Sequence, residues 1–429
     1  MAKNALPVSL YRHTFRTRRG QLYCENVPVE GIAEKVGTPV YIYSKKTILE
    51  HYRKLRSALA WLNPLICFSV KSNSNLAVLK TLARAGSGFD VVSGGELFRV
   101  LKVGADPRKI VFASVGKTDT EIQEALRRRI LLFNVESLAE LSRIEYWARR
   151  MRRPARAALR LNPEIEPHTH HYISTGRSES KFGIHFETAR QIFHEREKFP
   201  HVSLEGVHIH IGSQIESSKP FIEAIRKVLA FIDELRRRGI TIRWLNIGGG
   251  LGIVYSRERV QTAQEYAKRI IPLLKGKKLH LILEPGRFIS GNSGILVTKL
   301  LYVKPQGRKR FLIVDAGMND LIRPSLYSAY HEIEPVQRTR GPKWPDCDIV
   351  GPVCESGDFL AKNRPFPRVK EGSLLAVYGA GAYGFVMASN YNSRPRPAEV
   401  LVSGTRFAVV RARESQKDLI CGERIPKWV

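Results

Sequence analysis

The chain has 429 residues, of which 43% are hydrophobic and 26% charged, a balance typical of a soluble globular protein with about two domains. Its formal net charge of +30 raises the question of nucleic-acid binding, but the arginine clusters fall at the ends of predicted helices, where cations stabilise the helix dipole. No aromatic residues alternate with these clusters, so we expect no specific nucleic-acid partner and only non-specific adhesion to polyanions at low salt.

The sequence also argues against a membrane or a metal partner. The longest uncharged run, residues 373–389, is too short for a good membrane span, and residues 1–20 lack the apolar core of a signal peptide. The five cysteines show no CxxC spacing, which favours a reducing compartment and argues against zinc. We therefore expect a cytoplasmic protein without a metal site.

The first part of the chain carries short strand-like runs at residues 22–23, 27–29 and 40–43, with a helical turn at 32–36. Residues 47–62 follow as an amphipathic helix, because their apolar side chains recur on one face.

From residue 64 the pattern alternates regularly between strands and helices. Short apolar runs predict strands buried on both faces, and the amphipathic stretches between them predict helices. The eight predicted strands are residues 65–70, 89–92, 110–113, 131–135, 157–161, 207–211, 242–247 and 279–283. This order favours a (β/α)8 barrel over residues 41–293, and an open doubly wound sheet is the alternative that the pattern leaves.

From residue 294 the pattern changes to strands with glycine and proline turns and without regular helices. The predicted strands are residues 294–303, 311–315, 374–378 and 400–410. The chain is thus of the α/β plus all-β class, and residues 294–429 are expected to form a second, antiparallel β-sandwich or β-barrel domain. We expect the strands of residues 1–40 to join that domain.

Function in a barrel of this kind collects at the carboxyl ends of the strands. Lys71 follows the first predicted barrel strand. A lysine held against apolar walls loses hydration, which favours the neutral amine and would let it form an imine with an aldehyde cofactor. The alternative is a lysine that extends from the strand end into solvent.

Two motifs later in the barrel could complete a cofactor site. The glycine loop LNIGGGLG, residues 245–252, follows the seventh strand, where such barrels often bind phosphate, although it could be a plain tight turn. Glu284 ends the eighth strand in LILEPGRF, and a buried carboxylate there needs a partner. That partner is either Arg287 or the ring nitrogen of a pyridoxal cofactor.

The remaining candidates are a histidine pair, a cysteine and a tyrosine. His208 and His210 alternate on one strand and could be metal ligands or core residues, while His210 could stack on an aromatic cofactor. Cys354 lies in GPVCESGDFL, where it is either a small buried apolar residue or a proton donor. Tyr383 lies in the glycine loop of residues 379–385.

With these residues in this order, the chain resembles the fold type III pyridoxal-phosphate-dependent decarboxylases, which share the fold of alanine racemase. Within them it is similar to the diaminopimelate decarboxylases over residues 38–387. The strings that carry the resemblance are TPVYIYS, FDVVSGGEL, HYISTGRSESKFGI, HIHIGSQ, LNIGGGLG, LEPGR, MNDLIRPSLYSAYH and CESGDFLA.

The resemblance implies roles for the residues around pyridoxal 5'-phosphate. Lys71 would join the cofactor covalently, Glu284 would pair with its ring nitrogen and His210 would stack on its ring. The phosphate would be bound by residues of two glycine-containing loops with two helpers, namely Gly248, Gly249, Gly250, Pro285, Gly286, Arg287, Ser213 and Tyr383.

The implied reaction is the decarboxylation of meso-2,6-diaminopimelate to L-lysine and CO2, the final step of lysine synthesis. Cys354 would return a proton to the reacting carbon, and Glu355 would bind the distal ammonium. In the family both come from the second subunit, so the resemblance implies a homodimer. The distal carboxylate would be bound by cations and donors, namely Arg287, Arg323, Tyr327 and Tyr383.

Alternatives differ in what the pocket must bind. A related decarboxylase could act on ornithine, arginine or carboxynorspermidine. The ornithine and arginine enzymes need an acidic pocket for a cationic tail, which Arg323 would repel. Alanine racemases place arginine at the ring nitrogen, where this chain has Glu284. An inactive pyridoxal carrier would lack the second domain. Three departures from the family pattern, Ser72, Phe89 and His171, remove no reacting group.

Overall fold

The computed structural model describes residues 9–165, 181–256, 258–339 and 341–429. The chain divides into two compact units. One comprises the described residues up to 48, those between 254 and 258, and those from 290 onward. The other comprises residues 49–253 and 259–289, with the described part of each range. His171 and most of the HYISTGRSESKFGI motif lie outside the described residues.

Among the described residues of the second unit, eight parallel strands close into a barrel, and the prediction of a (β/α)8 barrel is confirmed. In chain order they are β5 (Leu65–Ser69), β6 (Gly88–Val91), β7 (Ile110–Phe112), β8 (Leu132–Val135), β9 (Ala155–Leu161), β10 (Val202–Ile209), β11 (Trp244–Asn246) and β12 (His280–Leu283). Closure comes from β12, which pairs with β5 through Ile282 and Leu65. An open sheet is therefore ruled out.

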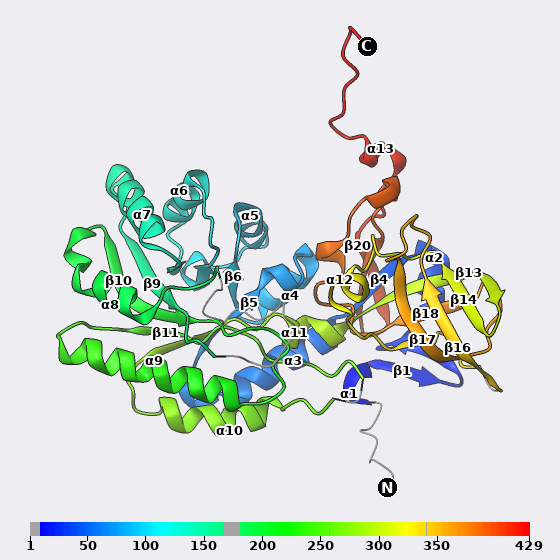
Figure 1. The fold of residues 1–429 in the computed structure, drawn as a ribbon, viewed down its shortest axis with the longest axis horizontal. Helices are drawn as coiled ribbons and strands as arrows, with labels where there is room; N and C mark the ends of the chain where they lie inside the picture. The colour runs from blue at the N-terminus through cyan, green and yellow to red at the C-terminus, as the bar shows by residue number, and fades with distance from the viewer. Residues whose placement is uncertain (1–8, 166–180, 257, 340) are drawn as a thin grey trace. The chain divides into compact units, whose positions relative to one another are not determined.

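Helices separate the strands and cover the outside of the barrel (Figure 1). They are α3 (Lys45–Ala58), α4 (Leu76–Arg84), α5 (Gly94–Lys102), α6 (Asp119–Arg128), α7 (Leu138–Met151), α8 (Phe186–His194), α9 (Lys219–Arg237) and α10 (Ala263–Leu274). Side-chain caps begin several of them. Thr118 and Glu121 form a reciprocal capping box at α6. At α7, Ser137 accepts from the Glu140 N–H, but the Glu140 carboxylate accepts from the Glu136 N–H, so only half of a capping box is formed there.

The first unit is built on a mixed sheet that combines strands from both ends of the chain. In the part of the chain that the structure describes, its path is β17–β16–β14–β13–β4–β19–β20, with β18 and β15 branching from β13. The strands are β4 (Val40–Ser44), β13 (Gly294–Gln306), β14 (Lys309–Val314), β15 (Ile333–Pro335), β16 (Lys343–Val350), β17 (Phe359–Pro367), β18 (Leu374–Val377), β19 (Ala398–Ser403) and β20 (Arg406–Arg411).

Two pairings of this sheet, β14 with β16 and β19 with β4, are parallel, so the sheet is mixed where only antiparallel strands were expected. The single strand predicted at residues 400–410 is wrong. Gly404 adopts a φ of +63° between β19 and β20, and the two strands form a hairpin.

The N-terminal residues form a smaller sheet and a helix beside this one. Strands β1 (Phe15–Arg18), β2 (Gln21–Cys24) and β3 (Val27–Pro28) pair in order, and α2 (Val29–Val36) begins three residues before the predicted turn. Phe15 and Leu22 share one apolar core with Val40 and Ile295. The N-terminal strands are thus buried against the sheet of the first unit.

Candidate active site

Lys71 lies at the carboxyl end of a barrel strand, as predicted, but its surroundings are polar. Strand β5 ends at Ser69, and Lys71 occupies a single 3-10 turn, Val70–Ser72. Its Nζ donates a hydrogen bond to Oδ2 of Asp90 at 2.8 Å, and Ser69 Oγ donates to the same oxygen at 2.5 Å. The Lys71 side chain is 36% exposed. The prediction of apolar walls around the amine is therefore wrong.

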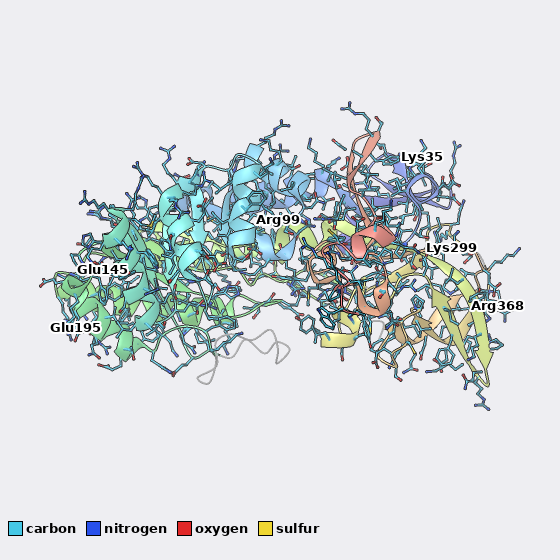
Figure 2. All side chains as sticks on the ribbon, turned by 90° about the horizontal axis from the view of Figure 1, so that it is seen from above. Lys35, Arg99, Glu145, Glu195, Lys299 and Arg368 are labelled. Carbon is cyan, nitrogen blue, oxygen red and sulfur yellow. The ribbon has the colours of Figure 1, made fainter. Side chains whose placement is uncertain are left out.

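Asp90, on β6, was not singled out from the sequence. Its side chain is fully buried. Burial raises the pKa of this carboxyl, the negative charge of Glu284 adds to the effect, and Lys71 and Ser69 oppose it. The neighbouring turn is also fixed, because Arg99 on α5, labelled in Figure 2, donates to the backbone oxygen of Ser74 at 3.2 Å.

Backbone hydrogen bonds join the Lys71 turn to the loops after β11 and β12. The Ser69 N–H donates to the Pro285 oxygen at 3.1 Å, and the Glu284 N–H donates to the Gly248 oxygen at 2.8 Å. A Cβ added at Gly286 would lie 3.0 Å from the Cβ of Ser72. The lysine, the carboxylate and the glycine loop, which are far apart in the sequence, are thus brought together.

The glycine loop after β11 accepts no side chain. Gly248 and Gly250 have φ values of +68° and +96°, and a Cβ on Gly249 would lie 2.2 Å from the backbone oxygen of Glu284. Two of its N–H groups already have protein acceptors. Gly248 donates to Asn246 Oδ1 at 2.9 Å, and Gly249 donates to His210 Nδ1 at 3.1 Å. A phosphate would therefore depend more on Gly250 and on the loop that carries Arg287.

Glu284 is a buried carboxylate, 4% exposed, with three polar neighbours. Its Oε1 accepts from Asn246 Nδ2 at 2.6 Å and from Asn134 Nδ2 at 2.9 Å. Its Oε2 lies 3.3 Å from His208 Nε2, within range of charge attraction but without an aligned hydrogen bond. Arg287 instead donates to Ser213 Oγ through its Nη2 at 3.1 Å.

Burial by itself would raise the pKa of Glu284, but His208 and Lys71 outweigh it, so the pKa lies well below its usual range. This carboxyl therefore stays ionised throughout the ordinary pH range. An ionised carboxylate inside the barrel could hold a proton on the ring nitrogen of a bound heterocycle.

His210 is neutral and has a defined tautomer. Burial lowers its pKa, and the charges of Arg160 and Lys71 lower it further. Since the Gly249 N–H donates to Nδ1, the ring proton lies on Nε2. A neutral imidazole fixed at the edge of the glycine loop is suited to stacking on a flat cofactor ring.

Further buried polar side chains lie near Glu284 and His210, and the sequence assigned them no role. The side chain of Lys117 is wholly buried, donates to the backbone oxygen of Asn134 at 2.8 Å and pairs with Glu140 at 2.6 Å. Arg160 pairs with Glu136 at 2.6 Å. A polar residue beside or within an apolar strand predicts a buried polar group. The sequence does not show which residues that group contacts.

The other candidates belong to the first unit. Arg323 begins the short helix α12 (Arg323–Tyr327) and is 6% exposed. Its guanidinium lies 4.9 Å from the ring centre of Tyr255, and its Nη1 is 2.9 Å from His331 Nε2. Tyr327, also predicted to bind substrate, is the last residue of the same helix.

The loop after β16 presents Cys354 and Glu355 at the surface, so the alternative of a buried apolar cysteine is wrong. Asp358 closes this loop, because its two oxygens accept from the N–H groups of Val353 and Met318, each at 2.6 Å. Ser325 on α12 donates to the backbone oxygen of Gly357 at 2.5 Å. Cys354, Glu355 and Arg323 therefore lie on segments that are bonded to each other.

Tyr383, half-buried in the loop that follows β18, has a φ of +56°. Its neighbours fix this conformation, since a Cβ on Gly381 would lie 2.0 Å from the Ser290 oxygen and one on Gly384 would lie 2.5 Å from the Ala380 oxygen. Among the described residues, no group of three or more acidic, cysteine or histidine side chains could hold a metal ion. Nor does any described helix combine the length and the apolarity needed to cross a bilayer.

The barrel residues fit pyridoxal phosphate on chemical grounds. The group needs an amine for its aldehyde, an acid at its ring nitrogen and donors for its phosphate, and the barrel brings together Lys71, Glu284 and a loop in which only glycine fits. The family model of the pyridoxal-binding domain of pyridoxal-dependent decarboxylases matches residues 45–291. The chain is thus a pyridoxal-dependent decarboxylase.

Relatives narrow this class. The diaminopimelate decarboxylase of Vibrio cholerae is 48% identical over 401 residues, which are 93% of this chain and 96% of its own, and that of Aquifex aeolicus is 46% identical over 94% and 96%. A crystal structure of diaminopimelate decarboxylase from Helicobacter pylori complexed with L-lysine has a TM-score of 0.88 at 42% identity, covering 91% of this chain and 98% of that one. The chain belongs to the diaminopimelate decarboxylase family.

Proposed function

We propose that this chain decarboxylates meso-2,6-diaminopimelate to L-lysine and CO2 with pyridoxal phosphate, as the last step of lysine synthesis. The observation that carries the proposal is Glu284, a buried carboxylate whose pKa is lowered by its neighbours. When bound, pyridoxal phosphate supplies an electron sink for the electron pair left by loss of CO2, and an acid at the ring nitrogen deepens that sink. An arginine at the ring nitrogen, as alanine racemases have, would weaken the electron sink instead.

Within the barrel, Lys71 would hold the cofactor through its amine, and Glu284 would keep a proton on the ring nitrogen. His210 would pack flat against the ring. Gly250 and Gly286 would bind the phosphate through the backbone, with Gly248 and Gly249 shaping the loop. The proposed phosphate site would be completed by Pro285, Arg287, Ser213 and Tyr383, as the family resemblance implies.

The first unit would supply recognition of the substrate's unreacted end, which is an L-amino acid head. Arg323 and Tyr327 would bind its carboxylate, because a planar guanidinium matches a carboxylate with two parallel hydrogen bonds. Arg287 and Tyr383 would assist, and Glu355 would bind the ammonium. Cys354 would deliver a proton to the carbon that loses CO2.

We further propose a cytoplasmic homodimer in which Cys354 and Glu355 serve the partner's cofactor. Both side chains are exposed on a loop that Asp358 fixes, which is what a contribution in trans requires. Mixing a Lys71→Ala chain with a Cys354→Ala chain tests this arrangement, since some mixed dimers would regain one intact site. Mixtures without any recovered activity would contradict it.

The decisive experiment measures CO2 release from meso-diaminopimelate, ornithine, arginine and carboxynorspermidine, each with added pyridoxal phosphate. We expect release from diaminopimelate alone, and none from a Lys71→Ala chain. Faster release from ornithine or arginine would replace the proposal with a related decarboxylase. No release from any of them would favour an inactive carrier.

A further inference from the structure

His331 is fully buried and both of its ring nitrogens are engaged. Nδ1 lies 2.8 Å from the backbone oxygen of Tyr378, and Nε2 lies 2.9 Å from Arg323 Nη1. A guanidinium can only donate hydrogen bonds, so Nε2 must be the acceptor and Nδ1 must carry the proton. The bonds therefore define a neutral imidazole that links the backbone of the sheet to the guanidinium.

Tyr255 completes the support around the same guanidinium. Its ring faces Arg323, with 4.9 Å between the ring centre and Cζ, and meets His331 edge-on at 5.4 Å. The ring is itself held, since a Cβ on Gly379 would lie 3.0 Å from it. Neither the imidazole nor the phenol ring is negatively charged, so neither competes with a carboxylate ligand for Arg323.

The anchor of this arrangement is backbone rather than a mobile side chain. Tyr378 directly follows β18, and its N–H donates to the backbone oxygen of Glu332 at 2.8 Å. Glu332 is the residue that follows His331. Tyr378, which accepts from the imidazole, and Glu332 are therefore already joined by a backbone hydrogen bond. His331 can move little, and the direction of the Arg323 Nη1 bond is set by the sheet.

We propose that His331 is a positioning residue that aims Arg323 at the carboxylate of the L-amino acid head, and thereby sets the preference for ligands that carry this head. The inference rests on the proposed function, in which Arg323 binds that carboxylate. It predicts that loss of the acceptor at Nε2 weakens binding of ligands with the carboxylate and leaves ligands without it unaffected.

Two variants of His331 each preserve a different one of its two hydrogen bonds. In His331→Gln an amide oxygen can replace Nε2 as the acceptor for Arg323, whereas in His331→Asn an amide nitrogen can replace Nδ1 as the donor to Tyr378. Each variant loses one bond and the ring volume, so the two serve as matched controls for a purely structural effect. Thermal unfolding of the holoenzyme should shift similarly in both.

The ligand pair is L-lysine, which keeps the amino acid head, and cadaverine, which lacks the carboxylate, each titrated into the holoenzyme by calorimetry. For His331→Asn we expect L-lysine affinity to fall about tenfold, since one charged hydrogen bond is misdirected, while cadaverine affinity stays within about twofold. KM for diaminopimelate should rise similarly with kcat nearly unchanged. His331→Gln should keep L-lysine affinity within about threefold of the wild type.

A double-mutant cycle checks that the effect passes through Arg323. In an Arg323→Ala background, His331→Asn should cause no further loss of L-lysine affinity. Equal losses in the Asn and Gln variants, a parallel loss for cadaverine, or an undiminished loss in the Arg323→Ala background would overturn the proposal. Failure of the proposed function itself would show differently, as a wild-type holoenzyme that releases no CO2 from diaminopimelate.

Discussion

Replacement of Asn246 by aspartate tests whether Glu284 is ionised, with almost no change in side-chain shape. Asn246 Nδ2 donates to Glu284 Oε1 at 2.6 Å, so Asn246→Asp puts a second carboxylate oxygen in that place. With an effective dielectric constant of about 20, two unit charges at this separation repel by about 6 kcal/mol. At 1.36 kcal/mol per unit, that energy corresponds to about 4 to 5 pKa units. The pair should therefore keep one proton at neutral pH.

The sign of the stability effect follows from this raised pKa. A carboxyl that holds its proton more tightly in the folded state stabilises the protein below its unfolded pKa of about 4, and this contribution is lost as pH rises through the folded value. We expect Asn246→Asp to cost about 1 kcal/mol at pH 5, which is about one unit above the unfolded pKa, and about 3 to 6 kcal/mol at pH 8. With Glu284 sharing a proton, kcat at pH 7.5 should fall by about 100-fold.

The assay is urea unfolding followed by circular dichroism at both pH values, with CO2 release measured in parallel. The exposed Asn26, whose Oδ1 accepts from Arg18 Nη2 at 2.8 Å, provides the control, since Asn26→Asp places the new charge beside a cation. That control should be as stable as the wild type at both pH values. An Asn246→Asp protein with wild-type stability at pH 8 and unchanged kcat would refute the assignment of Glu284 as a buried anion.

Three further predictions concern single side chains. Lys71→Ala should abolish both CO2 release and the yellow absorption of the purified protein, and normal turnover in this variant would rule out Lys71 as the cofactor lysine. Arg323→Ala should raise KM for diaminopimelate by at least about tenfold while cofactor affinity, followed by fluorescence, is unchanged, whereas equal losses would make Arg323 structural. Glu96→Gln should leave stability unchanged at pH 4 and raise it by about 2 to 3 kcal/mol at pH 8. Burial raises the pKa of Glu96 to about 7, so its stabilisation is lost as pH rises through that value. The measurement is again urea unfolding, and a pH-independent difference would contradict the reasoning.

The barrel could be predicted from the sequence because each of its strands is buried on both faces. Such a strand reads as an apolar run, for example Ile110–Phe112, and the helices between runs show their own period. The sheet of the first unit lacks this signal. Strands β16 and β17 contain prolines and mix exposed with buried positions without a regular period, and both were missed. The hairpin of β19 and β20 was missed because its turn is marked by one glycine.

The candidate site was predictable where a residue's place in the barrel decides its neighbours. Lys71 and Glu284 end strands that close the barrel side by side, so their proximity follows from strand order. Asp90 and Asn246 lie within apolar strands, and one strand alone does not show whether such a residue faces the barrel interior. The polar surroundings of Lys71 could not be inferred for the same reason, since they come from Asp90 on the neighbouring strand.

Two buried carboxyls close to Lys71 have pKa values that their surroundings shift in opposite directions. Glu284 is lined by two amide donors and by His208, which lowers its pKa, whereas the pKa of Asp90 is raised by burial and by the negative charge of Glu284 itself. Titratable neighbours whose pKa values diverge are typical of sites that divide acid and base roles. Glu284 is thus suited to be a permanent anion, as a partner of the ring nitrogen must be. Asp90, bonded to Nζ, is the carboxyl whose ionised form depends on the positive charge of Lys71.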